Sequence, residues 1–128
     1  MGRVGPVLEF GVGTGRVALP LWERDVEVHG IEFSPAMAAR LWEKPGGDRI
    51  ALTLGDFAVT RIDRTFSLVY IAYNTIMNLT RQDEQVACFA NAAAHLRPGG
   101  RFVVEVLVPD LRRLPPGKTI QPFALSET

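Results

Sequence analysis

Three glycines at alternate positions follow a short apolar run near the beginning of the chain. The run is Pro6–Phe10, and the glycines are Gly11, Gly13 and Gly15. Glycine is required where a backbone turns with positive φ or where a ligand lies against bare backbone. Between a buried strand and the start of a helix, such a loop directs free N–H groups and the helix dipole into the crevice at the strand's carboxyl end. The loop therefore indicates a nucleotide or cofactor site.

The spacing of these glycines distinguishes between classes of cofactor. A dinucleotide-binding loop has the pattern G-x-G-x-x-G, whereas Arg16 stands where the last of its glycines would be. A phosphate-binding P-loop is excluded because no Gly-Lys-Ser/Thr sequence follows the glycines. A nicotinamide-dependent oxidoreductase is therefore disfavoured but stays as an alternative. A tight turn without any ligand is the structural alternative.

Two glutamates lie at the ends of the first two apolar runs. A buried carboxylate without a partner is costly, so Glu9 is expected to accept hydrogen bonds from the glycine loop or to face a cationic ligand group. Glu32 ends the second run, Val26–Glu32, where a carboxylate can accept hydrogen bonds from both hydroxyls of a ribose. The alternative for Glu32 is an ordinary surface glutamate at a strand end.

A third candidate position follows the third apolar run. Asp56 and Phe57 come directly after Ile50–Leu54 and Gly55. A carboxylate can accept a hydrogen bond from the exocyclic amine of adenine, and a neighbouring aromatic ring can stack on the base. These residues therefore predict an adenine contact, with a simple turn as the alternative.

Apolar runs of strand length alternate with helical patterns along the chain, which predicts an α/β fold with a parallel sheet and crossover helices. The five predicted strands are Pro6–Phe10, Val26–Glu32, Ile50–Leu54, Phe66–Ala72 and Arg101–Val108. The predicted helices run from Thr14 to about Arg24, from Pro35 to before Pro45, and from about Arg81 to Leu96. Pro20 should weaken the first turns of the first helix, and Arg97–Gly100 should end the third.

Four short segments occur in order along the sequence: Glu9–Gly15, Gly30–Met37, Gly55–Phe57 and Leu96–Phe102. Together they resemble the ordered motifs of class I S-adenosylmethionine-dependent methyltransferases, and the resemblance covers roughly residues 5–108. It implies a Rossmann-like sheet, S-adenosylmethionine as the cofactor, and methyl transfer to a nitrogen, oxygen or carbon atom of a small-molecule acceptor. The cofactor carries the reactive group, so no catalytic residue is assigned.

The resemblance also implies a role for each part of the site. The loop Gly11–Gly15 would lie under the methionine portion of the cofactor, with Glu9 near its amino group. Glu32 would hold the ribose, and Phe33 would flank the adenine. The pair Asp56–Phe57 would contact the base.

The end of the fourth predicted strand faces the sulfonium region in the enzymes that the chain resembles. Tyr73 and Asn74 follow this strand. They are interpreted as contacts to the methionine end of the cofactor or to the methyl acceptor. A purely structural role is the alternative for both residues.

Composition excludes several classes of partner. The chain has 128 residues with 14 basic and 14 acidic side chains, so no broad field attracts nucleic acid or an anionic membrane. No apolar run approaches the ~20 residues of a membrane span, and the sequence predicts a soluble cytoplasmic protein. The single cysteine, Cys88, cannot form an internal disulfide or a cysteine metal cluster, and no metal site is predicted.

The two histidines and the cysteine are interpreted as structural. His29 lies within the second predicted strand. His95 lies at the end of the third helix, where a cation complements the helix dipole. Cys88 lies in the middle of that helix and is expected to be a buried small apolar side chain.

The sequence predicts one domain, residues 1–108, followed by a loop or a truncated C-terminal segment at 109–128. The enzymes that it resembles have a longer sheet ending in an antiparallel hairpin, and a helical cap before the first strand; both are expected to be absent here. The fifth strand would then expose an edge that a second copy of the chain could cover as a homo-oligomer. Truncation of a longer enzyme is the preferred interpretation, and a cofactor-binding fragment without turnover is the alternative to an active methyltransferase.

Overall fold

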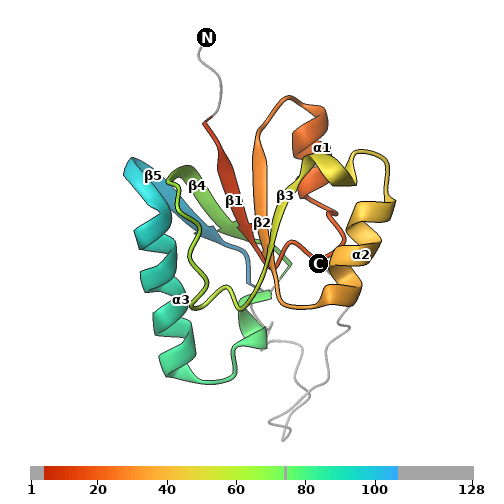
Figure 1. The fold of residues 1–128 in the computed structure, drawn as a ribbon. Coiled ribbons are helices and arrows are strands. Elements are labelled where there is room, and N and C mark those ends of the chain that lie inside the picture. Colours follow the sequence, from red (N-terminus) through yellow and green to blue (C-terminus); the bar gives the residue numbers. More distant parts are fainter. Residues whose placement is uncertain (1–4, 74, 107–128) are drawn as a thin grey trace, which may run out of the picture.

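Five parallel strands form one sheet in the spatial order β3-β2-β1-β4-β5 (Figure 1). The strands are β1 (Val7–Phe10), β2 (Val28–Glu32), β3 (Ala51–Leu54), β4 (Phe66–Ile71) and β5 (Leu96–Val104). This computed structural model describes residues 5–73 and 75–106. The predicted α/β class with a five-stranded parallel sheet is confirmed.

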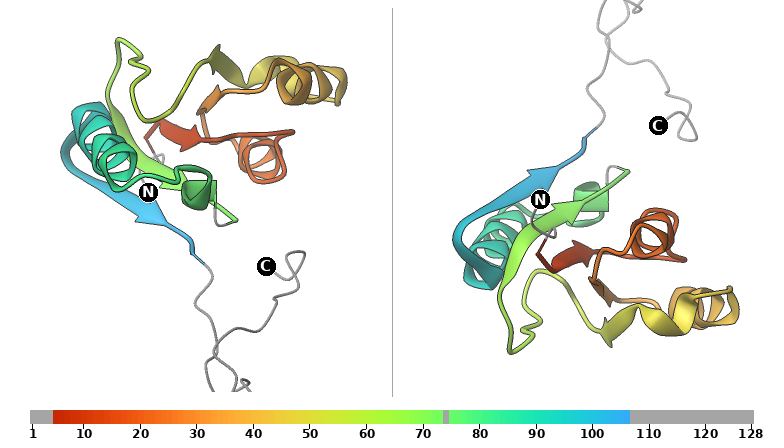
Figure 2. Two further views of the ribbon diagram at one scale, coloured as in Figure 1. Left: turned by 90° about the horizontal axis from the view of Figure 1, so that it is seen from below. Right: turned by 90° about the horizontal axis from the view of Figure 1, so that it is seen from above.

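Helices lie in every connection between successive strands except that from β3 to β4, and they cover both faces of the sheet (Figure 2). They are α1 (Ala18–Glu23), α2 (Pro35–Glu43) and α3 (Gln82–His95), with two short 3₁₀ helices, η1 (Gly47–Arg49) and η2 (Thr75–Asn78). Helices α1 and α2 lie on one face of the sheet, whereas α3 lies on the other. The sheet is therefore the middle of three layers.

Successive residues of β1 pack in two separate apolar clusters, because side chains alternate between the faces of a strand. Leu8 and Phe10 belong to the cluster that includes Ala92 of α3. Val7 belongs to the cluster that includes Leu41 of α2. All four residues of β1 are buried, so the one acidic side chain of this strand is enclosed together with its apolar neighbours.

Helix α2 begins immediately after the carboxyl end of β2, as the sequence predicts. The Ser34 hydroxyl accepts a hydrogen bond from the Met37 amide at 3.2 Å, and Pro35 occupies the first helical position. This combination fixes a helix start because the cap satisfies a free amide and proline is preset for the helical φ. Because α2 begins so soon after β2, Glu32 and the start of α2 lie at the same edge of the sheet.

Helix α1 is shorter than predicted, because it begins at Ala18 rather than at Thr14. Gly15 has φ +86°, which lies outside the helical region. Pro20 lies in the first turn, where its missing amide removes no intrahelical hydrogen bond. The residues between Thr14 and Ala18 therefore belong to the glycine loop rather than to the helix.

The segment Arg97–Gly100, predicted to separate α3 from β5, instead lies within the range of β5. Leu96 pairs with Phe66, but the next registered pair joins Arg101 to Leu68. Leu96 and Arg101 on β5 are farther apart in sequence than their partners Phe66 and Leu68 on β4. The extra residues of β5 therefore bulge out of the ladder. Regular pairing begins at Arg101, where the sequence predicts the strand to begin.

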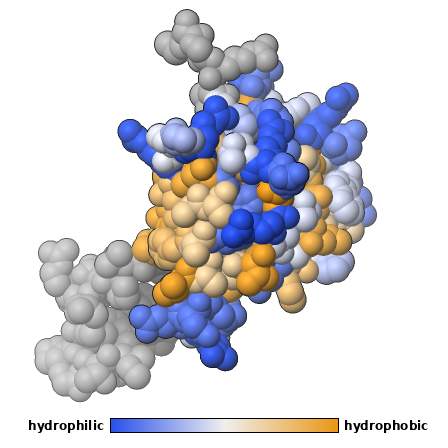
Figure 3. Space-filling view, turned by 60° about the vertical axis from the view of Figure 1, so that its left-hand side comes forward, coloured by the Kyte–Doolittle hydropathy of each residue, from blue (hydrophilic) through white to orange (hydrophobic). Residues whose placement is uncertain are grey.

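An apolar patch bordered by hydrophilic residues lies on the side of the molecule that carries α3 and β5 (Figure 3). Val86 and Phe89 of α3 are exposed, and the Phe89 ring meets the Phe102 ring of β5 edge-on at 5.1 Å. In the described part of the chain, β5 pairs with β4 alone. No helix within residues 5–73 or 75–106 is long and apolar enough to cross a membrane.

Candidate functional site

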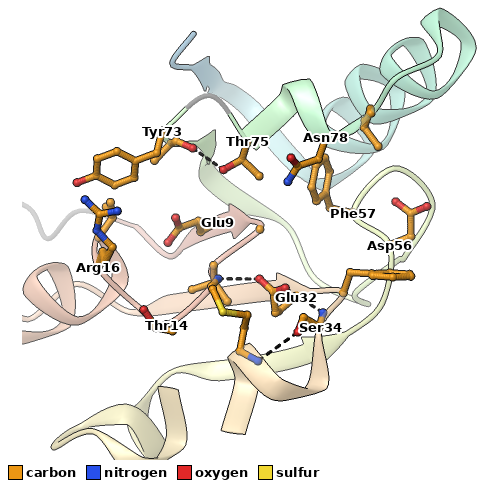
Figure 4. Close-up of a pocket in the computed structure, with 18 of the residues that line it drawn as sticks. Glu9, Thr14, Arg16, Glu32, Ser34, Asp56, Phe57, Tyr73, Thr75 and Asn78 are labelled. Carbon is orange, nitrogen blue, oxygen red and sulfur yellow. Dashed lines mark hydrogen bonds between the residues drawn. The ribbon is translucent and has the colours of Figure 1, made fainter. Parts of the chain in front are cut away.

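A cavity of about 570 Å³ lies at the carboxyl ends of the strands (Figure 4). The order of strands reverses between β1 and β4, and open parallel sheets bind ligands in the crevice at such a reversal. The volume falls within the range of small-molecule sites, roughly 300–1,000 Å³. The position and size of the cavity are therefore those of a ligand site.

The glycine loop forms the wall of the cavity above β1. Gly11 and Gly13 line the cavity with φ values of +73° and +58°, which favour glycine. A Cβ at Gly11 would lie 2.6 Å from Thr75 Cγ2, so this position also requires glycine for space. The Gly11 amide donates to the Ile31 carbonyl at 2.8 Å, which ties the loop to the end of β2.

Glu32 holds two loops of the site together. Its Oε1 accepts a hydrogen bond from the Gly13 amide at 2.7 Å, and its Oε2 accepts one from the Ser34 amide at 2.9 Å. The expectation that the glycine loop donates to Glu9 is therefore corrected: the loop donates to Glu32. Backbone amides that turn toward β2 reach the carboxylate at the end of that strand, not the one within β1.

Glu9 lies beneath the loop with only 3% of its surface exposed, yet its side chain lines the cavity. The Tyr70 hydroxyl donates to its Oε1 at 2.9 Å. Burial raises the pKa of Glu9 to about 8; the Tyr70 hydrogen bond opposes this shift and the nearby charge of Glu32 adds to it. Burial likewise raises the pKa of Tyr70. At neutral pH this shift favours the protonated form of the Glu9 carboxyl.

The connection after β3 is fixed from two sides. Asp56 Oδ1 accepts a hydrogen bond from the Ala58 amide at 2.8 Å. The Phe57 ring stacks on Phe10 with centroids 5.4 Å apart. Asn91 of α3 donates from Nδ2 to the Phe57 carbonyl at 2.8 Å. These contacts position the Asp56 carboxylate at the edge of the cavity.

Tyr73 follows β4 in an unusual backbone conformation. Its φ is +55°, a value that costs free energy for a side chain other than glycine. Its amide donates to Glu105 Oε1 at 2.6 Å, so the end of β5 holds the residue in place. The guanidinium carbon of Arg16 lies 4.3 Å from the centre of the Tyr73 ring. Arg16 and Tyr73 together form one end of the cavity.

The structure brings eight of the predicted site residues to this one cavity. They are Glu9, Gly11, Gly13, Glu32, Phe33, Asp56, Phe57 and Tyr73. Gly15 does not line the cavity, because its position faces the side chains of Leu19 and Leu41 behind the wall. Asn74 lies outside the described residues, as does the predicted segment 109–128.

Several residues of the wall were not predicted from the sequence, among them Arg16, Thr75, Asn78 and Glu84. Thr75 and Asn78 belong to η2, directly after β4, so the rule that sites gather at carboxyl ends of parallel strands could have identified them. Glu84 enters from the first turn of α3, and no local signal in the sequence marks it.

The interpretation of His95 as a structural residue and of Cys88 as a buried side chain is confirmed, with one correction. His95 Nε2 accepts a hydrogen bond from the Ile62 amide at 2.9 Å, and Nδ1 donates to the Asn91 carbonyl at 2.7 Å. A nitrogen that accepts carries no proton, so His95 does not supply the cation expected at the helix end. Cys88 is fully buried, and burial raises its pKa to about 12.

Residues 7–100 match the family model described as a methyltransferase domain. The chain therefore belongs to this family of methyltransferase domains. The matched range contains the glycine loop together with Glu9, Glu32 and Asp56. This membership removes the nicotinamide-dependent oxidoreductase as an alternative.

Relatives and solved structures agree with the family. The cypemycin N-terminal methyltransferase of Streptomyces sp is 30% identical over 103 residues, which cover 80% of this chain and 42% of that protein. The CcbJ methyltransferase of Streptomyces caelestis has a TM-score of 0.80 at 45% identity, over 91% of this chain and 48% of that chain. The glycopeptide N-methyltransferase MtfA complexed with S-adenosylhomocysteine has a TM-score of 0.72 at 33% identity, over 80% of this chain and 46% of that chain. The chain spans less than half the length of each of these proteins.

Proposed function

We propose that this chain forms the S-adenosylmethionine-binding part of a methyltransferase that acts on a small molecule. The observation that carries the proposal is a row of three carboxyl groups along the cavity: Glu9 within β1, Glu32 at the end of β2 and Asp56 just after β3. The cofactor presents an ammonium, two ribose hydroxyls and an adenine amine, and these donors match the acceptors in that order. Family membership and the MtfA complex with S-adenosylhomocysteine support the same cofactor.

Glu9 provides a test of whether these residues fit the cofactor. It is a buried carboxyl that faces the cavity, and its hydrogen-bond partner among the described residues is Tyr70. A ligand ammonium beside it would favour its charged form and offset the cost of a buried unpaired carboxylate. The residues present therefore fit an amino-acid group at this end of the cavity.

When bound, S-adenosylmethionine supplies a methyl group that its sulfonium activates. The residues of the chain would bind and orient it: Glu32 would accept hydrogen bonds from the ribose hydroxyls, and Asp56 would accept one from the adenine amine. Phe33 lies at the cavity wall with 74% of its surface exposed, and it would flank the base. Holding donor and acceptor in line supplies much of the rate enhancement through proximity and orientation.

We further propose that the atom that accepts the methyl group is a nitrogen. The glycopeptide N-methyltransferase MtfA carries nitrogen transfer in its name, and the cypemycin N-terminal methyltransferase is named for an N-terminus. On this chain, Thr75, Asn78 and Glu84 form the wall that follows β4, and we assign that wall to the acceptor side. A carboxylate there suits an acceptor that carries an amine.

Label transfer tests the acceptor. The chain is incubated with methyl-labelled S-adenosylmethionine and matched small amines and hydroxyl compounds. Label in amines supports the nitrogen assignment, whereas label confined to hydroxyl compounds contradicts it. Binding of the cofactor without label in any acceptor identifies the cofactor-binding fragment without turnover.

Replacing Glu32 with alanine is expected to weaken binding of S-adenosylhomocysteine by roughly 1–3 kcal/mol, about five- to 150-fold in Kd. The variant loses the acceptor for the ribose hydroxyls, and it also releases the Gly13 and Ser34 amides that Glu32 now holds. Isothermal titration calorimetry measures the change.

Glu27→Ala is the matched control, because Glu27 is an exposed glutamate just before β2 that does not line the cavity. This control should bind S-adenosylhomocysteine as the unmodified protein does. An unchanged affinity in Glu32→Ala would refute the ribose assignment. Equal losses in both variants would show a general effect on the fold.

A further inference from the structure

Two of the buried residues of α3 are polar and lie outside the cavity. Asn91 and His95 are 3% and 1% exposed, and they are about one helical turn apart. Neither is among the described residues that line the cavity. Burying a polar side chain costs free energy unless it makes hydrogen bonds. The groups that these two side chains bind therefore indicate what they do.

Both side chains bind the connection between β3 and β4, which runs beside α3 (Figure 1). Asn91 donates from Nδ2 to the Phe57 carbonyl at 2.8 Å and to the Thr60 carbonyl at 2.9 Å. A side-chain amide has two N–H donors, so this one residue makes both bonds at once. His95 accepts a hydrogen bond from the Ile62 amide further along the connection. Because the connection contains no helix of its own, α3 holds its backbone in place.

The segment that Asn91 holds is the turn that begins with Asp56. The Asp56 carbonyl accepts hydrogen bonds from the Val59 amide at 3.1 Å and from the Thr60 amide at 2.8 Å. The Asp56 Oδ1 accepts one from the Ala58 amide at 2.8 Å. These bonds join the carboxylate and the backbone of the turn in one unit. A shift of this turn relative to α3 therefore also shifts the Asp56 carboxylate.

We propose that Asn91 is a positioning residue for the adenine of the cofactor: it holds the turn where Asp56 can accept a hydrogen bond from the exocyclic amine. This inference rests on the proposed function, in which Asp56 faces that amine. Without Asn91, two carbonyls of the turn lose their donor, and a turn that rearranges to regain hydrogen bonds displaces the carboxylate. A hydrogen bond weakens steeply with misalignment, so the displaced carboxylate no longer selects the amine.

The test compares two ligands that differ only in the adenine amine. The first is S-adenosylhomocysteine, and the second is its deamino analogue, in which a hydrogen replaces the exocyclic amine. In the unmodified chain, Kd for the analogue is expected to be about tenfold higher than Kd for S-adenosylhomocysteine. In Asn91→Leu, Kd for S-adenosylhomocysteine is expected to rise about tenfold, whereas Kd for the analogue is expected to stay unchanged. The selectivity for the amine is then lost.

Val28→Ala is the matched control, because it also removes buried contacts but on the other face of the sheet. Val28 is 2% exposed, belongs to the cluster that includes Leu41 of α2, and does not line the cavity. This variant should lower Tm and leave the Kd values of both ligands unchanged. Equal weakening of both ligands in Asn91→Leu, or no change in either, would overturn the positioning role.

Nuclear magnetic resonance of the unmodified chain gives a second readout that holds even if Asn91→Leu does not fold. The side-chain amide signals of Asn91 are expected to shift when S-adenosylhomocysteine binds and to stay in place when the deamino analogue binds. Equal shifts with both ligands, or no shift with either, would contradict the proposal.

The unmodified chain also distinguishes failure of this inference from failure of the proposed function. If it binds S-adenosylhomocysteine and the deamino analogue equally well, the cofactor site stands and the positioning role of Asn91 falls. If it binds neither ligand, the proposed cofactor itself is wrong.

Discussion

Gly15→Ala is expected to lower the free energy of unfolding by about 2–5 kcal/mol, although the residue touches no ligand site. Gly15 has φ +86°, where a side chain is strained. A Cβ there would lie 2.5 Å from Leu41 Cδ1 and 3.1 Å from Leu19 Cδ1, and Leu41 is fully buried. Strain in the backbone and overpacking of the core therefore add. Urea-induced unfolding followed by circular dichroism measures the loss.

Gly13→Ala is the matched comparison, because Gly13 shares the positive φ but has space. Its φ is +58°, and the nearest atom to a Cβ would be Met37 Cε at 3.6 Å. This variant should lose only about 1–2 kcal/mol of stability but should weaken binding of S-adenosylhomocysteine, because the methyl group enters the cavity wall. Equal losses of stability at the two positions would contradict the distinction between a packing glycine and a ligand-facing glycine.

Between about pH 5 and pH 7, Glu9 is expected to lower the free energy of unfolding by about 1.4 kcal/mol per pH unit as the pH rises. Burial raises the pKa of Glu9 from 4.5 to about 8 in the folded protein. In this range the folded state keeps the proton that the unfolded chain has lost, so stability decreases with increasing pH. The contribution of Glu9 is fully present below about pH 4.5 and is lost as the pH rises through about 8.

Glu9→Gln isolates this contribution from those of the other carboxyl groups. The amide is neutral at every pH and can still accept the hydrogen bond from Tyr70. Urea unfolding of both proteins at half-unit steps should give stabilities that converge at low pH and separate toward neutral pH, with Glu9→Gln the more stable. Parallel pH profiles would show that the Glu9 carboxyl does not carry the raised pKa.

The sheet could be predicted because each strand is a short apolar run that a strong local signal ends. Ser34 and Pro35 mark the start of α2 unambiguously, and the structure agrees. The start of α1 could not be placed correctly, because apolar residues at helical spacing extend the pattern backward into the loop. Only the positive φ of Gly15 and its packing against Leu41 show where the loop ends.

Site residues that follow strands could be predicted from the sequence. Contacts between segments that are distant in the sequence could be predicted less well. Glu9, Glu32 and Asp56 were found because carboxyl ends of parallel strands share one edge. The contact between Glu32 and the glycine loop depends on how far β1 and β2 extend relative to each other. From the sequence, Arg16 could be used only to exclude a dinucleotide-binding loop. Its place at the cavity could not be predicted, because its contact with the Tyr73 ring depends on where the fold brings the end of β4.

Calorimetric titration of the unmodified chain with S-adenosylhomocysteine is the most direct test of a cofactor site at the carboxyl ends of β1, β2 and β3. Saturable binding of one ligand per chain, with Kd on the order of micromolar, is the result predicted. The contradictory result is a chain that circular dichroism shows to be folded, but that gives neither binding heat nor a ligand-induced rise in Tm.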